Sequence, residues 1–208
     1  MIYLLLLLPL LASCAPATTP TPETQIVSIY ATPATRTWLP DAFACTPAGT
    51  VVSVANDTIE ADIFLHLGEP DILVGAAYQI DTEEILVVTH RQSPLQNMSV
   101  DDVRELFAGQ GDPSMQVWVY APGEDVQRVF EQAVMKGRSV SSLARLAVNP
   151  QHMSDTLNNE SNTVGILARH WNAGDSRFVY TIPDVPVLAI VGEEPQGEIQ
   201  AIIACLQK

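Results

Sequence analysis

The sequence predicts an α/β fold with mostly parallel strands, because short apolar runs of strand length alternate with amphipathic helical segments along almost the whole chain. The chain has 208 residues and a mean hydropathy of +0.16. This is enough apolar material for a substantial core, either in one domain or in one fold of two lobes. In folds of this class, ligands collect at the carboxyl ends of strands, where helix N-termini point donor groups inward.

The charge balance excludes several functions. Ten Lys and Arg stand against 24 Asp and Glu, for a net charge of −14. The chain therefore lacks the basic face that binds nucleic acid and the polybasic patch that binds a membrane surface. None of the four histidines lies at metal-ligand spacing from a nearby Cys, Asp or Glu, and the sequence has no phosphate loop, serine elbow or CxxC motif. We expect no metal, no cofactor and no enzyme activity.

The first residues indicate export and lipid anchoring. Residues 2–11 form an apolar run of signal-peptide length, well short of the roughly 20 residues that span a bilayer. The run ends in Leu11-Ala12-Ser13-Cys14, which resembles the bacterial lipobox with Cys14 as the lipidated first residue, although the preceding residues carry no charge. The alternative is an ordinary cleaved signal with a chance cysteine. We predict a signal peptide over 1–13, a Pro/Thr-rich tether over 14–24 and a folded domain over 25–208.

The folded part is expected to begin with strands around one helix. Apolar runs predict strands over 25–31, 51–55, 61–65 and 85–88. Thr32-Pro33 is typical of a helix start, with Thr32 as the N-cap and proline in the first turn. A helix is expected from there through Cys45, although Pro40 must delay or kink it.

The later helices have clearer signals. Ser99 can cap a helix over 99–107, Asp102 stands at the reciprocal position of a capping box, and Gly109 ends the helix. A second helix over 124–135 has one apolar face. The remaining expected elements are a weaker helix from Asn149-Pro150, a helix over 197–206, and strands over 116–120, 164–168, 178–180 and 187–191.

Five weak motifs follow one another in a familiar order. They are Ala61-Asp62-Ile63 with Gly68-Glu69-Pro70, the strand 85–90 with Pro94, Leu106-Phe107-Ala108-Gly109, Val117-Trp118-Val119-Tyr120 with Phe130-Glu131, and the segment 163–167. Together they resemble the type 2 periplasmic solute-binding fold, most of all its phosphate-binding branch. The resemblance covers about 25–208. It implies two lobes joined by a hinge of two crossing strands, with lobe one about 25–88 and 181–208 and lobe two about 89–180.

Cys45 and Cys205 can oxidise in an exported protein. A disulfide between them would join the start of the folded part to its last turn and contribute roughly 2–4 kcal/mol. The alternative is two buried thiols that never meet, because spacing alone cannot bring two alpha carbons within bonding reach. The type 2 topology returns the tail to lobe one, and the resemblance therefore favours the bridge.

The resemblance also implies that four loops face a solute held between the lobes. The first offers Thr32, Thr35 and Arg36 as donors to an oxyanion, and plain N-capping is the alternative. The second offers Asn56, Asp57 and Thr58, or forms a polar turn. The third and fourth loops contribute Gly68 and Glu69, and Gly123, Glu124 and Asp125, respectively.

The fourth loop departs from the phosphate-binding pattern. Alignment on Phe130 places the family's Ser-Gly-Thr-Arg positions on residues 124–127, where Glu124 and Asp125 come first and an amide, Gln127, replaces the arginine. Two carboxylates beside a dianion are unfavourable once desolvated, whereas in the first turn of a helix they interact well with its dipole. The helix-terminal role is the preferred interpretation, and Arg128, one residue along, is expected to point elsewhere.

These observations predict a lipid-anchored, extracytoplasmic solute-binding protein, a monomer that acts as the binding component of an ABC-type transporter. It would capture a small solute by lobe closure and present it to a membrane permease. The resemblance makes phosphate or another small oxyanion the first ligand to test, and the acidic loops make a neutral or cationic solute the main competitor. The alternative is a surface sensory or interaction module that kept the fold but lost the transport ligand.

Overall fold

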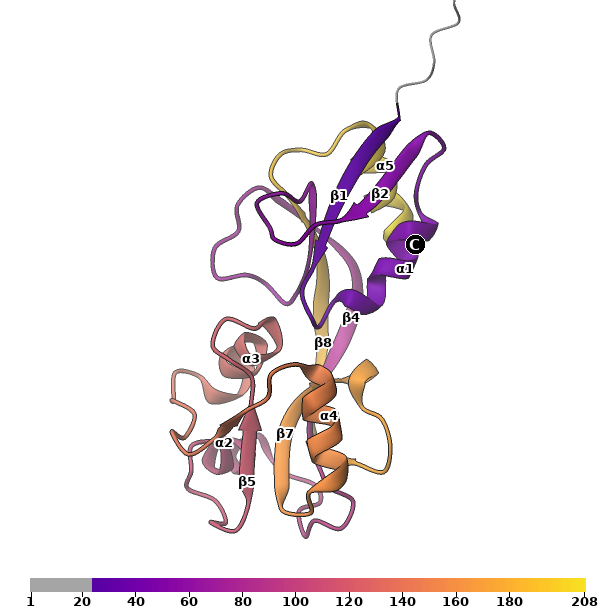
Figure 1. The fold of residues 1–208 in the computed structure, drawn as a ribbon. Helices are drawn as coiled ribbons and strands as arrows, with labels where there is room; N and C mark the ends of the chain where they lie inside the picture. The colour runs from indigo at the N-terminus through magenta and orange to yellow at the C-terminus, as the bar shows by residue number, and fades with distance from the viewer. Residues whose placement is uncertain (1–23) are drawn as a thin grey trace, which may run out of the picture.

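The computed structural model describes residues 24–208, which form two α/β lobes that share one eight-stranded sheet (Figure 1). The strand order is β2-β1-β3-β8-β4-β7-β5-β6. This confirms the predicted two-lobed α/β class. The expected signal peptide, the lipidated Cys14 and all but the last residue of the tether lie outside the described residues. Within residues 24–208, no helix is both long and apolar enough to cross a membrane.

Lobe one is built on three parallel strands. β1 (Gln25–Ala31) lies between β2 (Thr50–Val54) and β3 (Ile63–Leu67) and pairs with both. The chain between β1 and β2 forms a 3-10 turn, η1 (Arg36–Trp38), and the helix α1 (Leu39–Ala44). The helix start expected at Thr32 is therefore wrong. The α-helix begins only at Leu39, with proline in its first turn, where a missing N–H leaves no intrahelical bond unmade.

A disulfide closes lobe one. Cys45, directly after α1, bonds to Cys205 in the last helix, α5 (Gly197–Leu206), with alpha carbons 5.7 Å apart. The two residues are separated by 160 positions in the sequence. The bridge thus ties the beginning of lobe one to its end, and the C-terminus lies beside α1 (Figure 1).

Two long antiparallel strands, β4 (Ala76–Thr89) and β8 (Arg177–Val191), carry the chain between the lobes. The lobe-one half of β8 pairs with β3, and residues 85–89 of β4 pair with β7 (Thr163–Ala168) in lobe two. The strands therefore cross between the lobes a few residues before the boundary expected at 88/89. Their register shifts fall between Gln79 and Asp81, Glu83 and Ile85, and Val87 and Val88.

Lobe two adds strands and helices around β7. β5 (Gln116–Val119) runs parallel to β7 and to the short β6 (Arg145–Leu146). The helical elements are α2 (Val100–Phe107), α3 (Asp125–Phe130), the π-helical turn η2 (Glu131–Met135), α4 (Pro150–Asn159) and the 3-10 turn η3 (Arg169–Trp171).

The capping box predicted for α2 is confirmed. The Asp102 N–H donates to Ser99 Oγ at 3.2 Å, and the Ser99 N–H donates to Asp102 Oδ2 at 3.0 Å. The apolar stripes of α2 and α3 meet in the core, where the rings of Phe107 and Phe130 lie 4.5 Å apart, centre to centre, and both residues are fully buried. This packing holds α3 against α2 and limits which side of α3 can face lobe one.

Candidate functional site

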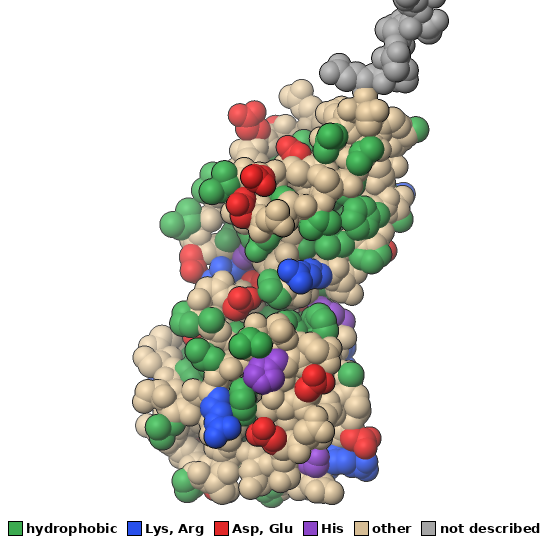
Figure 2. Space-filling view, viewed as in Figure 1, with side chains coloured by type: hydrophobic (Ala, Val, Ile, Leu, Met, Phe, Trp, Pro, Cys, Tyr) green, Lys and Arg blue, Asp and Glu red, His purple; other side chains and the backbone are tan. Residues whose placement is uncertain are grey.

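The lobes meet at a waist, where basic, acidic and histidine side chains lie near one another on the face shown in Figure 2. At this waist α3 of lobe two packs against the end of β3 in lobe one. Gly68 permits the close approach, because a Cβ at this position would lie 2.4 Å from Val129 Cγ2. Its φ of +74° is also in the left-handed region that favours glycine. Gly68, predicted to contact a ligand, instead contacts the other lobe.

The carboxylate of Asp125 crosses the waist and binds to lobe one. Its Oδ2 accepts hydrogen bonds from the Thr32 hydroxyl at 2.6 Å and from the Leu67 N–H at 3.0 Å. Its Oδ1 accepts from the adjacent Val126 N–H at 3.2 Å, and the residue is only 2% exposed. The sequence favoured a helix-terminal role for Asp125. The structure keeps it in the first turn of α3 but directs its carboxylate to donors of the opposite lobe.

Two threonines of the loop after β1 form the lobe-one side of this contact. Thr35 is fully buried, and its hydroxyl lies 2.9 Å from the Leu65 carbonyl, to which it can donate. The hydroxyl oxygens of Thr32 and Thr35 lie 3.0 Å apart. Thr35 thus fixes the loop, and the Thr32 hydroxyl hydrogen is directed to Asp125. Arg36, predicted with them, is exposed and makes no side-chain hydrogen bond or ion pair within residues 24–208.

A second contact across the waist joins His66 of β3 to Arg128 of α3. His66 Nδ1 lies 2.9 Å from the Gly68 carbonyl, so a neutral ring protonated at Nδ1 can donate to that carbonyl and accept from the guanidinium at Nε2. Burial lowers the pKa of His66, and Arg128 lowers it as well, against the opposing effects of the Gly68 carbonyl, Asp125 and Asp71. Arg128 therefore faces lobe one, contrary to the expectation that it points elsewhere.

Further polar contacts surround the hinge strands. Gln132 of η2 donates to Asp71 of lobe one at 3.1 Å. The indole N–H of Trp38 donates to Asp81 of β4 at 2.9 Å, and the Trp38 ring meets the ring of His170 edge-on at 5.5 Å. His170 in turn contacts the carboxylate of Glu83. None of these pairings follows from a local sequence motif, because the partners lie 43 or more positions apart.

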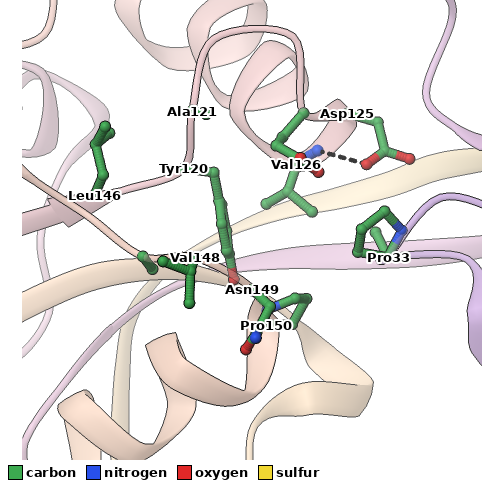
Figure 3. Close-up of a pocket in the computed structure, with 12 residues that line it drawn as sticks. Pro33, Tyr120, Ala121, Asp125, Val126, Leu146, Val148, Asn149 and Pro150 are labelled. Atoms are coloured by element: carbon green, nitrogen blue, oxygen red, sulfur yellow. Dashed lines mark hydrogen bonds between the residues drawn. The ribbon is translucent and has the colours of Figure 1, made fainter.

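A pocket of about 260 Å³ opens beside Asp125, between the lobes (Figure 3). Lobe one contributes Pro33 and Ala34, and lobe two contributes the rest of the wall. The lobe-two residues are Tyr120, Ala121, Glu124, Asp125, Val126, Leu146, Ala147, Val148, Asn149 and Pro150. The wall is therefore mainly apolar, with a small number of polar groups, as is usual for sites that bind small molecules.

The Tyr120 hydroxyl is a buried polar group of this pocket that lacks a hydrogen-bond partner. Tyr120 is 4% exposed, and its buried hydroxyl has no hydrogen-bond partner among the described residues. Burial raises the pKa of Tyr120 above its ordinary range, and the charges of Glu124 and Asp125 raise it further, so the hydroxyl stays protonated at neutral pH. Figure 3 shows the ring extending toward Asn149 and Pro150. Buried hydroxyls are rarely left unpaired, and an acceptor atom of a ligand would satisfy this one.

Glu124 makes the pocket acidic. It stands at the N-cap of α3 without a side-chain capping bond, and it lines the pocket. Burial raises the pKa of Glu124, and the neighbouring Asp125 adds to this effect. The residues that line the pocket include no Lys, Arg or His to balance these carboxylates. An anion would therefore be disfavoured here, and an uncharged or cationic group would be accepted more readily.

The other predicted ligand residues do not line the pocket. Residues 56–58 lie in an exposed turn, in which the Asp57 carboxylate accepts the N–H groups of Ile59 and Glu60 at 2.9 and 3.1 Å. This matches the polar-turn interpretation of that loop. Two predicted residues remain, the exposed Glu69 and Gly123, which has a φ of +99° in the turn before α3. Within residues 24–208, no three His, Cys, Asp or Glu side chains lie together as a metal site requires.

Comparison with known proteins supports the fold. No protein family and no curated protein matches the sequence. A structure described as a phosphate ABC transporter substrate-binding protein with bound phosphate, from Clostridium perfringens, matches with a TM-score of 0.70 and 12% identity, over 88% of this chain and 93% of that chain. An ABC-type phosphate transport receptor from Vibrio cholerae gives 0.65 and 13%, over 88% and 93%.

A regulatory domain shares the architecture equally well. The CcmR regulatory domain from Synechocystis PCC6803, in complex with 2-PG, matches with a TM-score of 0.67 and 12% identity, over 88% of this chain and 96% of that chain. The chain thus has the type 2 periplasmic-binding-like fold that the sequence predicted. At such low identity the similarity establishes the fold alone, which transport receptors and regulatory domains both use.

Proposed function

We propose that this protein binds a small solute in the pocket between its lobes, without chemical transformation, as an extracytoplasmic, lipid-anchored solute-binding protein of an ABC-type transporter. The observation that carries the proposal is the buried, unpaired hydroxyl of Tyr120 at a mainly apolar pocket. The pocket lies where two lobes meet around paired hinge strands, a geometry in which lobe closure can enclose a ligand.

The ligand is best assigned from the pocket wall. Phosphate is the ligand of the Clostridium perfringens structure, and a small oxyanion is the ligand suggested by the resemblance to that branch. In this chain the wall carries Glu124 and no basic side chain. We therefore expect an uncharged or cationic solute with one acceptor atom for the Tyr120 hydroxyl, and an oxyanion is the competing possibility to be tested beside it.

Thermal unfolding of the full chain in mild detergent tests ligand binding. The panel contains phosphate, sulfate, molybdate, amino acids, polyamines and sugars. A ligand at a hundred times its dissociation constant stabilises the folded chain by about 2.7 kcal/mol, which is a shift of several degrees. Tyr120→Phe is the matched variant, because it keeps the ring and removes only the hydroxyl. The shift should shrink in this variant. A panel without any shift would argue against solute binding.

Membrane anchoring needs a separate test. Replacing Cys14 with serine should move the protein from the membrane fraction to the soluble extracytoplasmic fraction, because the thiol is the proposed site of the lipid. Continued membrane retention of the variant would exclude this anchor.

A surface sensory module is the second candidate function. The observation that favours it is the likeness to a regulatory domain, together with an acidic pocket that departs from the phosphate-binding pattern. A transport component should co-purify with a membrane permease after crosslinking in cells. Ligand binding without a permease partner, but with a partner of another kind, would support the sensory role.

A further inference from the structure

We propose that Asp125 is a built-in substitute for an oxyanion: its carboxylate occupies donors of lobe one that are suited to a bound anion, and it thereby joins the two lobes and masks a latent anion-binding site. The inference goes beyond the proposed function and does not depend on it. It rests on the contacts of Asp125 with Thr32 and Leu67. Asp125 also lines the Tyr120 pocket, but neither the Tyr120 hydroxyl nor a solute in that pocket enters the argument.

The donors converge as they would on a ligand. The Thr32 hydroxyl and the Leu67 N–H both point to one oxygen, Asp125 Oδ2, at 2.6 and 3.0 Å. They come from the ends of two neighbouring parallel strands, β1 and β3, in lobe one. Ligands in open α/β sheets bind outside the carboxyl ends of the strands, and hydroxyl and main-chain N–H groups at that edge can donate to an oxyanion. The acceptor belongs to lobe two and stands 93 and 58 positions away in the sequence.

The site is buried and held in place from both sides. Leu67 is fully buried and Asp125 is 2% exposed, so the carboxylate is desolvated and depends on its hydrogen bonds. Thr35 anchors the Thr32 loop through the Leu65 carbonyl, and the contact between Gly68 and Val129 fixes the separation of the lobes. The positions of the Thr32 and Leu67 donors are therefore set by contacts that do not involve the Asp125 carboxylate.

The charge of Asp125 is met by neutral donors. In the part of the chain that the structure describes, no Lys or Arg forms an ion pair with it, and the nearby Arg128 guanidinium contacts His66 instead. The Thr32 hydroxyl and the Leu67 N–H can therefore stabilise a buried negative charge by donating hydrogen bonds to it. A free oxyanion of similar size would find the same donors if Asp125 were truncated.

Two consequences can be measured. In the native chain the donors are occupied, so phosphate, sulfate and small carboxylates should not bind there. Asp125→Ala removes the carboxylate and leaves room for an ion of about the size of formate. An external anion that accepts from the Thr32 hydroxyl, the Leu67 N–H and, in lobe two, the Val126 N–H should then restore the link between the lobes.

The experiment is chemical rescue of the full chain, followed by thermal unfolding at constant ionic strength. Formate, acetate, phosphate and sulfate are titrated against chloride. The midpoint of Asp125→Ala should be lower than that of the native chain and should rise by several degrees, saturably, with at least one of these anions. The native chain and Asp125→Asn, which fills the same space, should show no saturable rise. Glu69→Ala is the matched control, because it removes an exposed carboxylate that neither lines the pocket nor forms a side-chain hydrogen bond within residues 24–208.

A folded Asp125→Ala variant that responds to no anion would overturn the proposal, as would a response of equal size in Glu69→Ala. Saturable anion binding by the native chain that Asp125→Ala leaves unchanged would also overturn it. If Asp125→Ala does not fold, a double-mutant cycle of Thr32→Val and Asp125→Asn gives the answer. The double variant should be no less stable than the less stable of the two single variants. Additive losses in the free energy of unfolding would show that the two side chains act independently and would overturn the proposal.

Discussion

Replacing both Cys45 and Cys205 with serine should lower the free energy of unfolding by about 2–5 kcal/mol. The bridge spans 160 positions. The loop-closure entropy for that length is about 17 cal/mol/K, which corresponds to about 5 kcal/mol at 25 °C. The lower value applies if α1 and α5, which pack together in lobe one, stay partly associated in the reduced, unfolded chain. At roughly 2–4 °C per kcal/mol, the midpoint should fall by about 4–20 °C.

Urea unfolding followed by circular dichroism measures this loss. The native chain under reducing conditions is the control and should resemble the double-serine variant, because both lack the crosslink. The dependence of stability on urea should steepen in both, since an uncrosslinked unfolded chain exposes more surface. A loss below about 1 kcal/mol with an unchanged urea dependence would refute the loop-closure reasoning, because it would mean that the crosslink does little to restrict the unfolded chain.

The buried His66 ring should make the fold sensitive to acid. Burial lowers the pKa of His66 in the folded chain below the ordinary value of 6.5. Between these two pKa values the unfolded chain binds more protons than the folded chain, so stability falls as the pH is lowered from 6.5 to the folded-state pKa. His66→Gln should flatten this part of the pH profile, and an unaltered profile would contradict the assignment. Gly68→Ala should cost about 1–3 kcal/mol in urea unfolding, because of its φ of +74° and the contact with Val129. Gly123→Ala measures the cost of the positive φ alone, since its Cβ would meet nothing within 4 Å. Equal losses of unfolding free energy in the two variants would show that the Val129 contact does not contribute. Ser99→Ala should cost about 1 kcal/mol through the lost N-cap, whereas Ser99→Asp should retain most of the stability; equal unfolding midpoints for all three chains would disprove the capping role.

The sequence predicts best those elements whose signal is local. The helix over 99–107 has a capping pair, an apolar stripe and a terminal glycine, and the structure reproduces it almost residue for residue. The crossing strands are harder to foresee. Glu83 and Glu84 in β4, and Pro183 and Pro186 in β8, interrupt any apolar alternation. They are tolerated at the waist because Pro183 is exposed, Pro186 is half-buried, and the buried Glu83 carboxylate contacts His170.

The site could be predicted only in outline. The sequence placed Thr32 and Asp125 in loops expected to face the same cleft, but not within bonding distance of each other, because that contact depends on how two lobes pack. Tyr120 ends an apolar strand, which indicates burial but not that its hydroxyl lacks a partner. The contact of Arg128 with lobe one could not be predicted, because the rotation of α3 depends on the packing of Phe130 against Phe107, which no local motif shows.

The pairing of β4 with β8 gives the molecule a nested construction. Ile85 and Ile182 face each other across the two strands, so residues 85–182 form one uninterrupted insertion whose ends meet. The flanking segments are stapled together by the disulfide, and a protease nick within the insertion would therefore leave the pieces covalently connected. A single deletion could remove the insertion, and a tight turn could rejoin the chain. The hydroxyl of Thr32 and the amide of Leu67 would then face open water, with no resident carboxylate in front of them.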